Sequence, residues 1–230
     1  MLRAMLREWE LWGLVEARAG ASPDTLLAVD EHGRKLSFAE YLRASERVAA
    51  GLARLGIRAG ARVAWQLPTR IEALVLSAAI ARLGAVQIPI LPILREREVQ
   101  FIVAQTRPRL LIVPGVWRGF DYGAMAQRIA AAAPGEGCRA LVCAPELPEG
   151  DPATLPAAPA SGSGDELRWI LFTSGTTADP KGVQLTDTAL TLGAAGFCER
   201  LDLQREDRLA IPFPFTHVGG IGTLFSQLQV

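Results

Sequence analysis

The chain contains the run Trp169-Ile-Leu-Phe-Thr-Ser-Gly-Thr-Thr-Ala-Asp-Pro-Lys-Gly-Val183, which decides how the rest of the sequence is interpreted. Its first four residues are aromatic or branched and apolar, a pattern that predicts a buried strand. The loop that follows contains hydroxyl side chains, glycines and one lysine. Clustered phosphate oxygens are best held by hydroxyls, convergent backbone N–H groups and a positive charge. This loop is therefore a candidate polyphosphate site.

The composition makes the lysine of this loop informative. Lys35 and Lys181 are the only lysines among 24 basic residues. Lysine binds phosphate as a compact point charge, whereas arginine is a planar fork. One alternative is a polar surface turn between a strand and a helix. A Walker loop is another, but it needs Gly-Lys-Ser or Gly-Lys-Thr at the start of a helix, and here Gly182 and Val183 follow Lys181.

The segment from Thr173 to Val183 resembles the phosphate-loop signature of the adenylate-forming superfamily, which includes acyl-CoA synthetases, luciferases and the adenylation domains of peptide synthetases. That family usually has glycine where this chain has Ala178, and a positive φ angle there would strain an alanine. The resemblance implies that the residues binding the nucleotide phosphates are Thr173, Ser174, Gly175, Thr176, Thr177, Lys181 and Gly182.

Length and composition predict a folded protein of balanced charge. The chain has 230 residues, 50% of them hydrophobic, so we expect one large domain or two small ones. Its 24 basic and 24 acidic residues cancel, which argues against a nucleic-acid-binding surface. No stretch is long enough for an uncharged membrane span, and Arg3, Arg7 and Glu8 argue against a signal peptide. We expect a soluble, cytoplasmic protein.

The cysteines indicate neither a metal site nor a disulfide framework. Their number is odd, the interval from Cys138 to Cys143 is not a C-x-x-C arrangement, and no histidine lies nearby. We expect these two residues and Cys198 to be small buried or half-buried side chains in a reducing compartment. No metal-ligating residues are predicted.

Hydrophobic periodicity and turn residues predict that helices and strands alternate along the first part of the chain. Ser37 with Glu40, and Thr69 with Glu72, have the capping-box spacing that begins a helix. His32 is expected to be a solvated residue in a hairpin turn. Helices are expected at residues 1–18, 37–55, 69–83, 95–106 and 122–132, and strands at 25–29, 35–38, 62–67, 86–90, 110–113 and 140–143.

The segment 145–166 is rich in Pro, Gly, Ala, Ser and acidic residues, which predicts a flexible loop or linker. We place a first α/β subdomain before it, at residues 1–144, and the start of a second after it, at 167–230. There, Thr186 is expected to cap a helix to about Arg200, and residues 207–212 to form a strand. The predicted fold class is α/β, with mainly parallel sheets covered by helices.

A second motif is Pro212-Phe-Pro-Phe-Thr-His-Val-Gly-Gly-Ile-Gly222. A lone histidine is more often a core residue than a site residue. In the adenylate-forming family, however, Pro-x-x-His-x-Gly-Gly follows the phosphate loop at a comparable distance. The resemblance implies that His217 is the catalytic candidate, which orients the acyl group or gates its tunnel, with Gly219 and Gly220 in the acyl pocket. Thr216 stands where many relatives have an aromatic residue.

The resemblance implies ATP-dependent activation of a carboxylic acid. The carboxylate attacks the α-phosphorus of ATP, and pyrophosphate leaves as the acyl adenylate forms. Mg²⁺ and loop donors neutralise the β- and γ-phosphates. A thiol, expected to be coenzyme A, then displaces AMP to give a thioester. Residues 65–74 and 113–122 most resemble medium-chain and alicyclic acyl-CoA ligases, so we predict an acyl-CoA synthetase acting on a fatty or alicyclic acid.

The adenine- and ribose-binding motifs of this family, and its catalytic lysine, lie further along the chain than Val230. The sequence is therefore predicted to be an incomplete N-terminal portion of the large domain of such an enzyme, inactive by itself. Two other functions stay open. One is an adenylation domain that loads an amino or aryl acid onto a carrier protein. The other is a non-catalytic remnant that binds a nucleotide or an acyl ligand.

Overall fold

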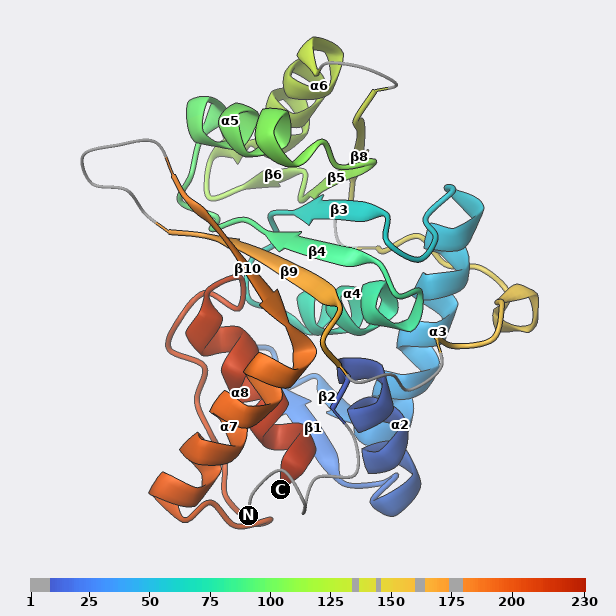
Figure 1. The fold of residues 1–230 in the computed structure, drawn as a ribbon, viewed down its shortest axis with the longest axis vertical. Helices are drawn as coiled ribbons and strands as arrows, with labels where there is room; N and C mark the ends of the chain where they lie inside the picture. Colours follow the sequence, from blue (N-terminus) through green and yellow to red (C-terminus); the bar gives the residue numbers. More distant parts are fainter. Residues whose placement is uncertain (1–8, 134–136, 144–145, 160–163, 174–179) are drawn as a thin grey trace.

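The computed structural model describes residues 9–133, 137–143, 146–159, 164–173 and 180–230. A six-stranded sheet with the order β10-β9-β4-β3-β5-β8 forms its centre (Figure 1). All neighbouring strands are parallel except β10 and β9, which are antiparallel. The α/β prediction is therefore confirmed. The strands are β3 (Arg62–Trp65), β4 (Val86–Pro89), β5 (Leu110–Val113), β8 (Arg139–Val142), β9 (Leu167–Phe172) and β10 (Gly182–Thr186).

Helices cover both faces of this sheet, and each face has its own hydrophobic core. Toward the top of Figure 1, α5 and α6 lie on one face, and the remaining helices lie on the other. The helices are α2 (Leu11–Ala21), α3 (Phe38–Arg54), α4 (Ile71–Arg82), α5 (Glu96–Thr106), α6 (Tyr122–Ala132), α7 (Asp187–Leu201) and α8 (Val218–Gln229), with a short 3₁₀ helix at Pro152–Thr154. Because both faces are covered, the central strands β4 and β5 are buried along their whole length, as parallel strands require; Gln87 in β4 is their one polar residue, and its amide donates to the Ser77 carbonyl (3.1 Å).

One of the two expected capping boxes is present and the other is not. The Ser37 hydroxyl accepts a hydrogen bond from the Glu40 N–H (3.2 Å), and the Glu40 carboxylate accepts one from the Ser37 N–H (2.8 Å). The prediction for Thr69 and Glu72 is wrong, because α4 begins only after Arg70. The Thr69 hydroxyl instead accepts a hydrogen bond from the distant Phe215 N–H (2.8 Å). The Thr69 hydroxyl therefore bonds to a residue far along the chain and not to the first turn of α4.

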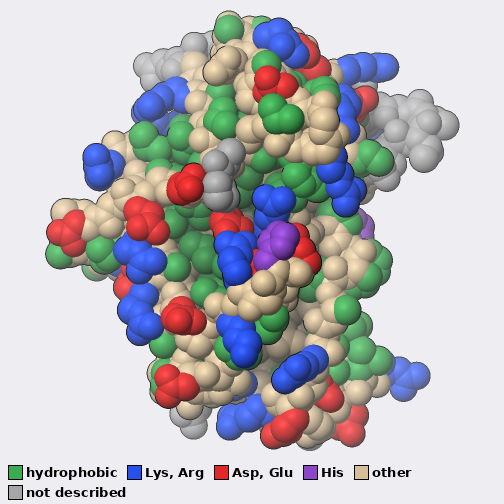
Figure 2. All heavy atoms as spheres, turned by 180° about the vertical axis from the view of Figure 1, so that it is seen from behind, with side chains coloured by type: hydrophobic (Ala, Val, Ile, Leu, Met, Phe, Trp, Pro, Cys, Tyr) green, Lys and Arg blue, Asp and Glu red, His purple; other side chains and the backbone are tan. Residues whose placement is uncertain are grey.

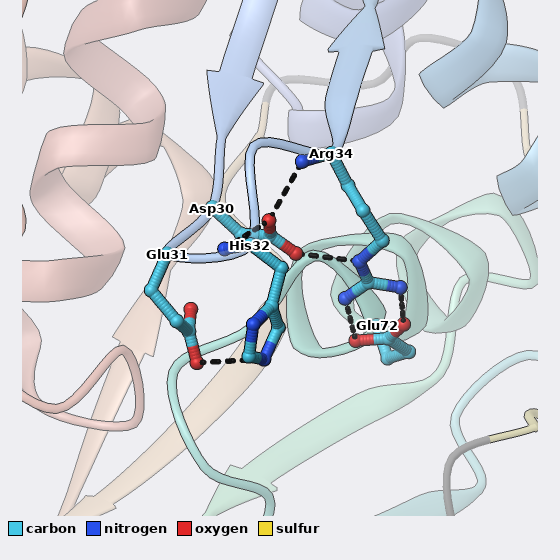
Figure 3. A network of polar contacts seen from close by, with 5 residues as sticks. All are labelled: Asp30, Glu31, His32, Arg34 and Glu72. Atoms are coloured by element: carbon cyan, nitrogen blue, oxygen red, sulfur yellow. Dashed lines mark hydrogen bonds and ion pairs between the residues drawn. The ribbon is translucent and has the colours of Figure 1, made fainter.

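Glu72, the second residue of that expected capping box, instead joins the N-terminal hairpin to α4. The hairpin consists of β1 (Leu26–Val29) and β2 (Lys35–Ser37), as expected. Arg34 donates to Asp30 (2.6 Å) within the hairpin and to both carboxylate oxygens of Glu72 (2.6 and 3.2 Å) on α4 (Figure 3). His32 is an exposed turn residue, as predicted, and its Nε2 lies 3.7 Å from a Glu31 oxygen.

Other differences from the expected elements concern short strands. Residues 207–212 form no strand, so that prediction is wrong. One edge strand of the sheet, β10, was not expected; it begins at Gly182, inside the motif quoted above. The aromatic loop after β5 contains a small antiparallel hairpin of β6 (Val116–Trp117) and β7 (Phe120–Asp121). Of the helix expected at residues 1–18, residues 1–8 lie outside the described part, and α2 begins at Leu11.

The segment expected to be a linker contacts α3 closely over its described part. The Gly150 N–H donates to the Arg47 carbonyl (2.9 Å), and a Cβ atom added to Gly51 would overlap the Pro148 carbonyl. Strands from both sides of this segment, β4 and β9, pair in one sheet. The division into subdomains at 1–144, 145–166 and 167–230 stays a prediction.

This contact predicts a large difference between two helical glycines. We expect Gly51→Ala to lower the free energy of unfolding by about 1–3 kcal/mol, because the added methyl group has no room beside the Pro148 backbone. Gly196→Ala on α7 is the matched control. It has open space around it and is expected to raise the free energy of unfolding by about 0.5–1 kcal/mol. Chemical denaturation of both variants measures the difference, and equal effects would contradict the packing of residues 146–159 on α3.

Candidate functional site

The ends of the phosphate loop are held together by the pairing of β9 with β10. Phe172 lies opposite Gly182, and beyond this pair the Thr173 N–H donates to the Lys181 carbonyl (3.1 Å). The pairing gives the loop a fixed base of two antiparallel strands. Four predicted phosphate-binding residues, Ser174, Gly175, Thr176 and Thr177, lie outside the described residues, as does Ala178.

Lys181 lies at this base with its charge available. Its side chain is exposed, and no ion pair within the described part of the chain involves it. At the neighbouring Gly182, packing leaves little room for a side chain. A Cβ atom at that position would lie 3.1 Å from the side chains of both Ile170 and Phe172 across the strand pair. Within the described residues, the Lys181 ammonium group therefore has no anionic partner where the two strands meet.

The two described ends of the loop also lie beyond the carboxyl end of β9, on the side of the sheet where ligands commonly bind. β9 itself is parallel to β4. In open α/β sheets, ligand sites lie beyond the carboxyl ends of the strands, where loops can provide backbone N–H groups and side chains. The position of the loop agrees with a binding role.

His217 caps the N-terminus of α8. Its Nδ1 atom accepts a hydrogen bond from the Gly219 N–H (3.1 Å), and its ring lies 5.7 Å from the Phe213 ring, between centroids. Since Nδ1 is the acceptor, the neutral imidazole carries its proton on Nε2. The side chain is exposed. His217 thus offers an N–H donor that a carboxylate can accept.

Packing requires glycine at position 220 and leaves little room for a side chain at position 219. A Cβ atom on Gly220 would lie 2.6 Å from the Phe215 Cα and 2.7 Å from the Pro214 carbonyl oxygen. On Gly219, it would lie 3.1 Å from the Phe213 ring. The first turn of α8 therefore packs directly against the segment that precedes it. Contact of either glycine with an acyl ligand stays a prediction.

The second motif is fixed to the sheet on one side. The Phe215 N–H donates to Thr69, and the Phe215 ring lies 5.9 Å from the Trp65 ring at the end of β3. Thr216 is 3% exposed, and its hydroxyl lacks a hydrogen-bond partner in the described structure. A side chain at position 216 therefore lies in the interior.

The two motifs are connected through helices α7 and α8. α7 follows β10 directly, and Thr186 caps it by accepting a hydrogen bond from the Ala189 N–H (3.1 Å), as predicted. The Gln229 amide on α8 donates to the Thr191 carbonyl on α7 (3.1 Å). Among the described residues, no hydrogen bond or ion pair joins His217 directly to the phosphate loop. The structure connects the motifs without bringing these side chains into contact.

Asp187 anchors the base of this assembly, and sequence reasoning missed it. The residue is 2% exposed in the first turn of α7. Its carboxylate accepts hydrogen bonds from the Leu11 N–H at the start of α2 (2.9 Å) and from the Trp169 indole N–H in β9 (2.6 Å). Burial raises the pKa of this carboxyl to about 6, although both hydrogen bonds favour the ionised form. Asp187 thus joins α2, β9 and α7, which are distant in the sequence, through one buried carboxylate.

The remaining titratable groups offer little chemistry. Burial raises the pKa of the Cys138 thiol to about 11 and that of Cys143 to about 12, so both stay protonated near neutral pH. Burial also raises the pKa of the half-buried Cys198. Within the described ranges, no group of three His, Cys, Asp or Glu residues could hold a metal ion.

The charge distribution on the surface and the length of the helices bear on binding to polyanions and membranes. On the face shown in Figure 2, basic and acidic side chains are interspersed, in keeping with a formal net charge of zero. Such a face lacks the single-sign field that a polyanion would require. None of the helices in the described part has both the length and the apolar character needed to span a bilayer.

A parallel α/β sheet with a Ser/Thr/Gly/Lys sequence after the carboxyl end of a strand is typical of nucleotide-binding proteins. The chain belongs to the AMP-binding enzyme family, whose model matches residues 15–229. The resemblance to adenylate-forming enzymes is thereby confirmed.

Known proteins agree with this assignment. The chain is 30% identical to the medium-chain fatty-acid–CoA ligase of Escherichia coli (strain K12), and the match covers 95% of this chain but 41% of that protein. A fatty acyl CoA synthetase from Mycobacterium tuberculosis is 26% identical with a TM-score of 0.77, covering 96% of this chain and 43% of that one. The o-succinylbenzoate coenzyme A synthetase of Bacillus subtilis, solved with ATP and magnesium ion, shares the fold with a TM-score of 0.80 at 23% identity. That match covers 94% of this chain and 54% of the synthetase chain.

Proposed function

We propose that this chain supplies the phosphate-binding part of an AMP-forming acid–thiol ligase. One observation carries the proposal: Lys181, exposed and without an ion pair among the described residues, stands at the base of a Ser/Thr/Gly loop, beyond the carboxyl end of β9. The family match supports the same function. Because the chain spans 41% of the first curated relative, the activity of the whole enzyme is part of the proposal.

The reaction has two balanced steps. In the first, a carboxylate oxygen bonds to the α-phosphorus of ATP, the bond to the bridging oxygen breaks, and pyrophosphate leaves. Lys181 and the Thr173 hydroxyl are proposed to hold the phosphate oxygens, and Mg²⁺ to enter on the nucleotide as MgATP. In the second, the sulfur of coenzyme A attacks the acyl carbon, its thiol proton is released, and AMP leaves with one oxygen of the original acid.

His217 is proposed to position the acid. Its Nδ1 atom is occupied by the Gly219 N–H, so the Nε2–H is the group that can donate to a carboxylate oxygen. Such a bond would orient the attacking carboxylate oxygen. It could persist as the negative charge of the carboxylate passes to the leaving pyrophosphate. His217 therefore acts by hydrogen bonding and does not need to accept a proton.

The names of the relatives support a proposal for the class of substrate. The E. coli relative is named for medium-chain fatty acids, and the M. tuberculosis structure for fatty acyl groups. We propose a fatty or alicyclic acid as substrate and coenzyme A as acceptor. We place the enzyme in the cytoplasm, since its three cysteines are all free thiols.

Carboxylate-dependent exchange of labelled pyrophosphate into ATP tests this function. The full-length protein encoded by the gene that contains this sequence would be assayed with medium-chain, alicyclic, aryl and amino acids. Exchange with one class of fatty or alicyclic acid, followed by thioester formation with coenzyme A, is expected. Exchange with amino or aryl acids and transfer to a carrier protein would favour an adenylation domain instead. Absence of exchange with every acid would refute the proposal.

The chain alone is expected to be inactive. The described residues include part of the proposed phosphate site, and the chain spans 41% of the length of the first curated relative. We therefore expect thioester formation by the 230-residue chain to stay at background, measured by consumption of free thiol. Robust turnover by this chain would show that its own residues complete the site.

A further inference from the structure

A cleft of about 220 Å³ lies beyond the carboxyl ends of three parallel strands. Leu67 and Pro68 come from the segment after β3, and Pro114 and Gly115 from the segment after β5. Cys143 follows β8 directly. The start of α4 and the first strand of the β6–β7 hairpin complete the wall, so that the other lining residues are Arg70, Glu72, Ala73, Val116 and Trp117. Apart from one arginine and one glutamate, the lining is apolar.

The cleft lies where the order of the strands reverses. β3 pairs with β4 on one side and with β5 on the other, so the chain turns back across β3 after it has formed β4. The connecting helices lie on opposite faces of the sheet: α4 leads from β3 to β4, and α5 leads from β4 to β5 (Figure 1). In open α/β sheets, ligands bind in the crevice beyond the carboxyl ends of the strands at such a reversal. The position of the cleft is therefore that of a ligand site.

Trp117 is a half-buried aromatic wall of the cleft, and its neighbours hold it in place. The turn that follows it has positive φ angles at Arg118 (48°) and Gly119 (75°), a pattern typical of type I′ hairpins. The Arg118 guanidinium lies over the Trp117 ring, 4.7 Å from the centroid, and the Tyr122 ring lies 6.2 Å away. The Tyr122 hydroxyl in turn donates to the Pro92 carbonyl (2.8 Å). The indole is therefore positioned before any ligand binds.

The two charged residues of the lining are in different states. Both carboxylate oxygens of Glu72 accept hydrogen bonds from Arg34 (2.6 and 3.2 Å), so its charge is compensated (Figure 3). Burial alone would raise the pKa of Glu72, but the Arg34 hydrogen bonds and the charges of Arg34 and Arg70 hold it below its ordinary value. Within the described ranges, the half-buried Arg70 side chain forms no ion pair and does not cap α4. One cation is left, which favours a singly charged ligand over a dianion.

We propose that this cleft binds a planar aromatic carboxylate, with the ring against Trp117 and Pro114 and the carboxylate on the Arg70 guanidinium. Aromatic rings stack on indole, and the planar fork of arginine matches a carboxylate. A cavity of about 150 Å³ holds one benzene ring, so about 220 Å³ is enough for a ring that bears a carboxylate or for two fused rings. The Cys143 thiol is protonated near neutral pH, because burial raises its pKa to about 12, and it adds no negative charge.

The lining draws on a part of the chain that the two sequence motifs do not include. Every lining residue lies between Leu67 and Cys143, and none belongs to β9, β10, α8 or the motif from Pro212 to Gly222. Binding in the cleft therefore requires neither Lys181 nor His217. It can be measured independently of the proposed activity.

Calorimetric titration of the full-length protein with naphthalene-2-carboxylate, and separately with the uncharged naphthalene-2-carboxamide, tests the proposal. We expect saturable binding of the carboxylate with a dissociation constant below about 1 mM. The amide has the same ring system without the charge and should bind about tenfold more weakly. Absence of saturable binding of the carboxylate, or equal affinities for the two ligands, would refute the proposal.

Three variants locate the binding. Arg70→Gln is expected to weaken carboxylate binding about tenfold and to leave amide binding unchanged, because only the carboxylate uses the guanidinium. Trp117→Leu should weaken both ligands about fivefold, since both use the indole face. Arg97→Gln, an exposed arginine on α5, should change neither. An equal loss for both ligands in Arg70→Gln would mean that this side chain supports the fold of the cleft and does not bind the carboxylate, which would contradict the proposal.

Two further measurements separate this cleft from the proposed activity. Lys181→Ala should leave carboxylate binding intact, even where it abolishes pyrophosphate exchange. Loss of binding in Lys181→Ala but not in Arg70→Gln would assign the ligand to the phosphate loop. Coenzyme A should not displace the naphthoate; displacement would assign the cleft to the thiol acceptor of the proposed function. Octanoate, which has the charge without the ring, should bind at least about fivefold more weakly. Any of the contrary results would overturn the proposal.

Discussion

Replacing Asp187 by alanine is expected to lower the free energy of unfolding by about 2–5 kcal/mol, one of the two largest effects anticipated for this chain. The carboxylate is the hydrogen-bond acceptor for the Leu11 N–H and for the Trp169 indole N–H. Removing it leaves two buried donors unsatisfied, and each costs about 1–3 kcal/mol. Urea denaturation measures the loss. A variant as stable as the parent would show that α2 and β9 do not depend on this residue.

The pH dependence gives a second measurement on the same residue. The pKa of Asp187 is raised from 3.8 to about 6 on folding, so the folded protein binds the proton more tightly than the unfolded chain. The associated stability is fully present below pH 3.8 and is lost as the pH rises through about 6. The difference corresponds to about 3 kcal/mol. Asp187→Asn should lack this decline, whereas Asp24→Asn, an exposed control, should keep it. Parallel profiles for Asp187→Asn and the parent would contradict the raised pKa.

Replacing Lys181 by alanine is expected to lower carboxylate-dependent pyrophosphate exchange by about 100-fold or more in the whole enzyme. Its ammonium lies at the base of the phosphate loop and forms no ion pair with a described residue, and its charge is needed most when negative charge develops on the leaving pyrophosphate. Lys181→Arg should recover part of the rate, because it keeps the charge but changes a point donor into a planar fork.

The chain provides a matched control for this effect. Lys35 is the only other lysine, is exposed, and lies in β2, away from the loop. Lys35→Ala should leave the exchange rate within about twofold of the parent, since removing a surface charge has little effect. A similar loss in both variants, or no loss in Lys181→Ala, would remove Lys181 from the proposed phosphate site.

Local sequence patterns predicted those parts of the fold that local contacts decide. Ser37 and Glu40 form their capping box because both partners lie within one turn, and β5 ends where the apolar run at Val113 ends. Thr69 has the same spacing to Glu72, but distant partners, Phe215 and Arg34, bind the two side chains. Spacing alone cannot show such competition from a residue far along the chain.

The candidate site shows the same limit. The motif containing Lys181 and the one containing His217 were found because each is a continuous run of unusual residues. Asp187 was missed because its meaning depends on Leu11 and Trp169, which lie 176 and 18 residues away. An acid next to a helix-capping threonine has the pattern of an ordinary first-turn residue. Only the three-dimensional contacts show that it is buried.

The transfer of oxygen from the acid to AMP tests the central proposal most directly. The whole enzyme would be given a carboxylic acid labelled with ¹⁸O in both carboxylate oxygens, together with MgATP and coenzyme A. Attack of the carboxylate on the α-phosphorus predicts that each AMP released carries one ¹⁸O atom, detected by mass spectrometry, and that the thioester keeps the other. AMP without label, or ADP in its place, would mean that no acyl adenylate forms and would contradict the function proposed for this chain.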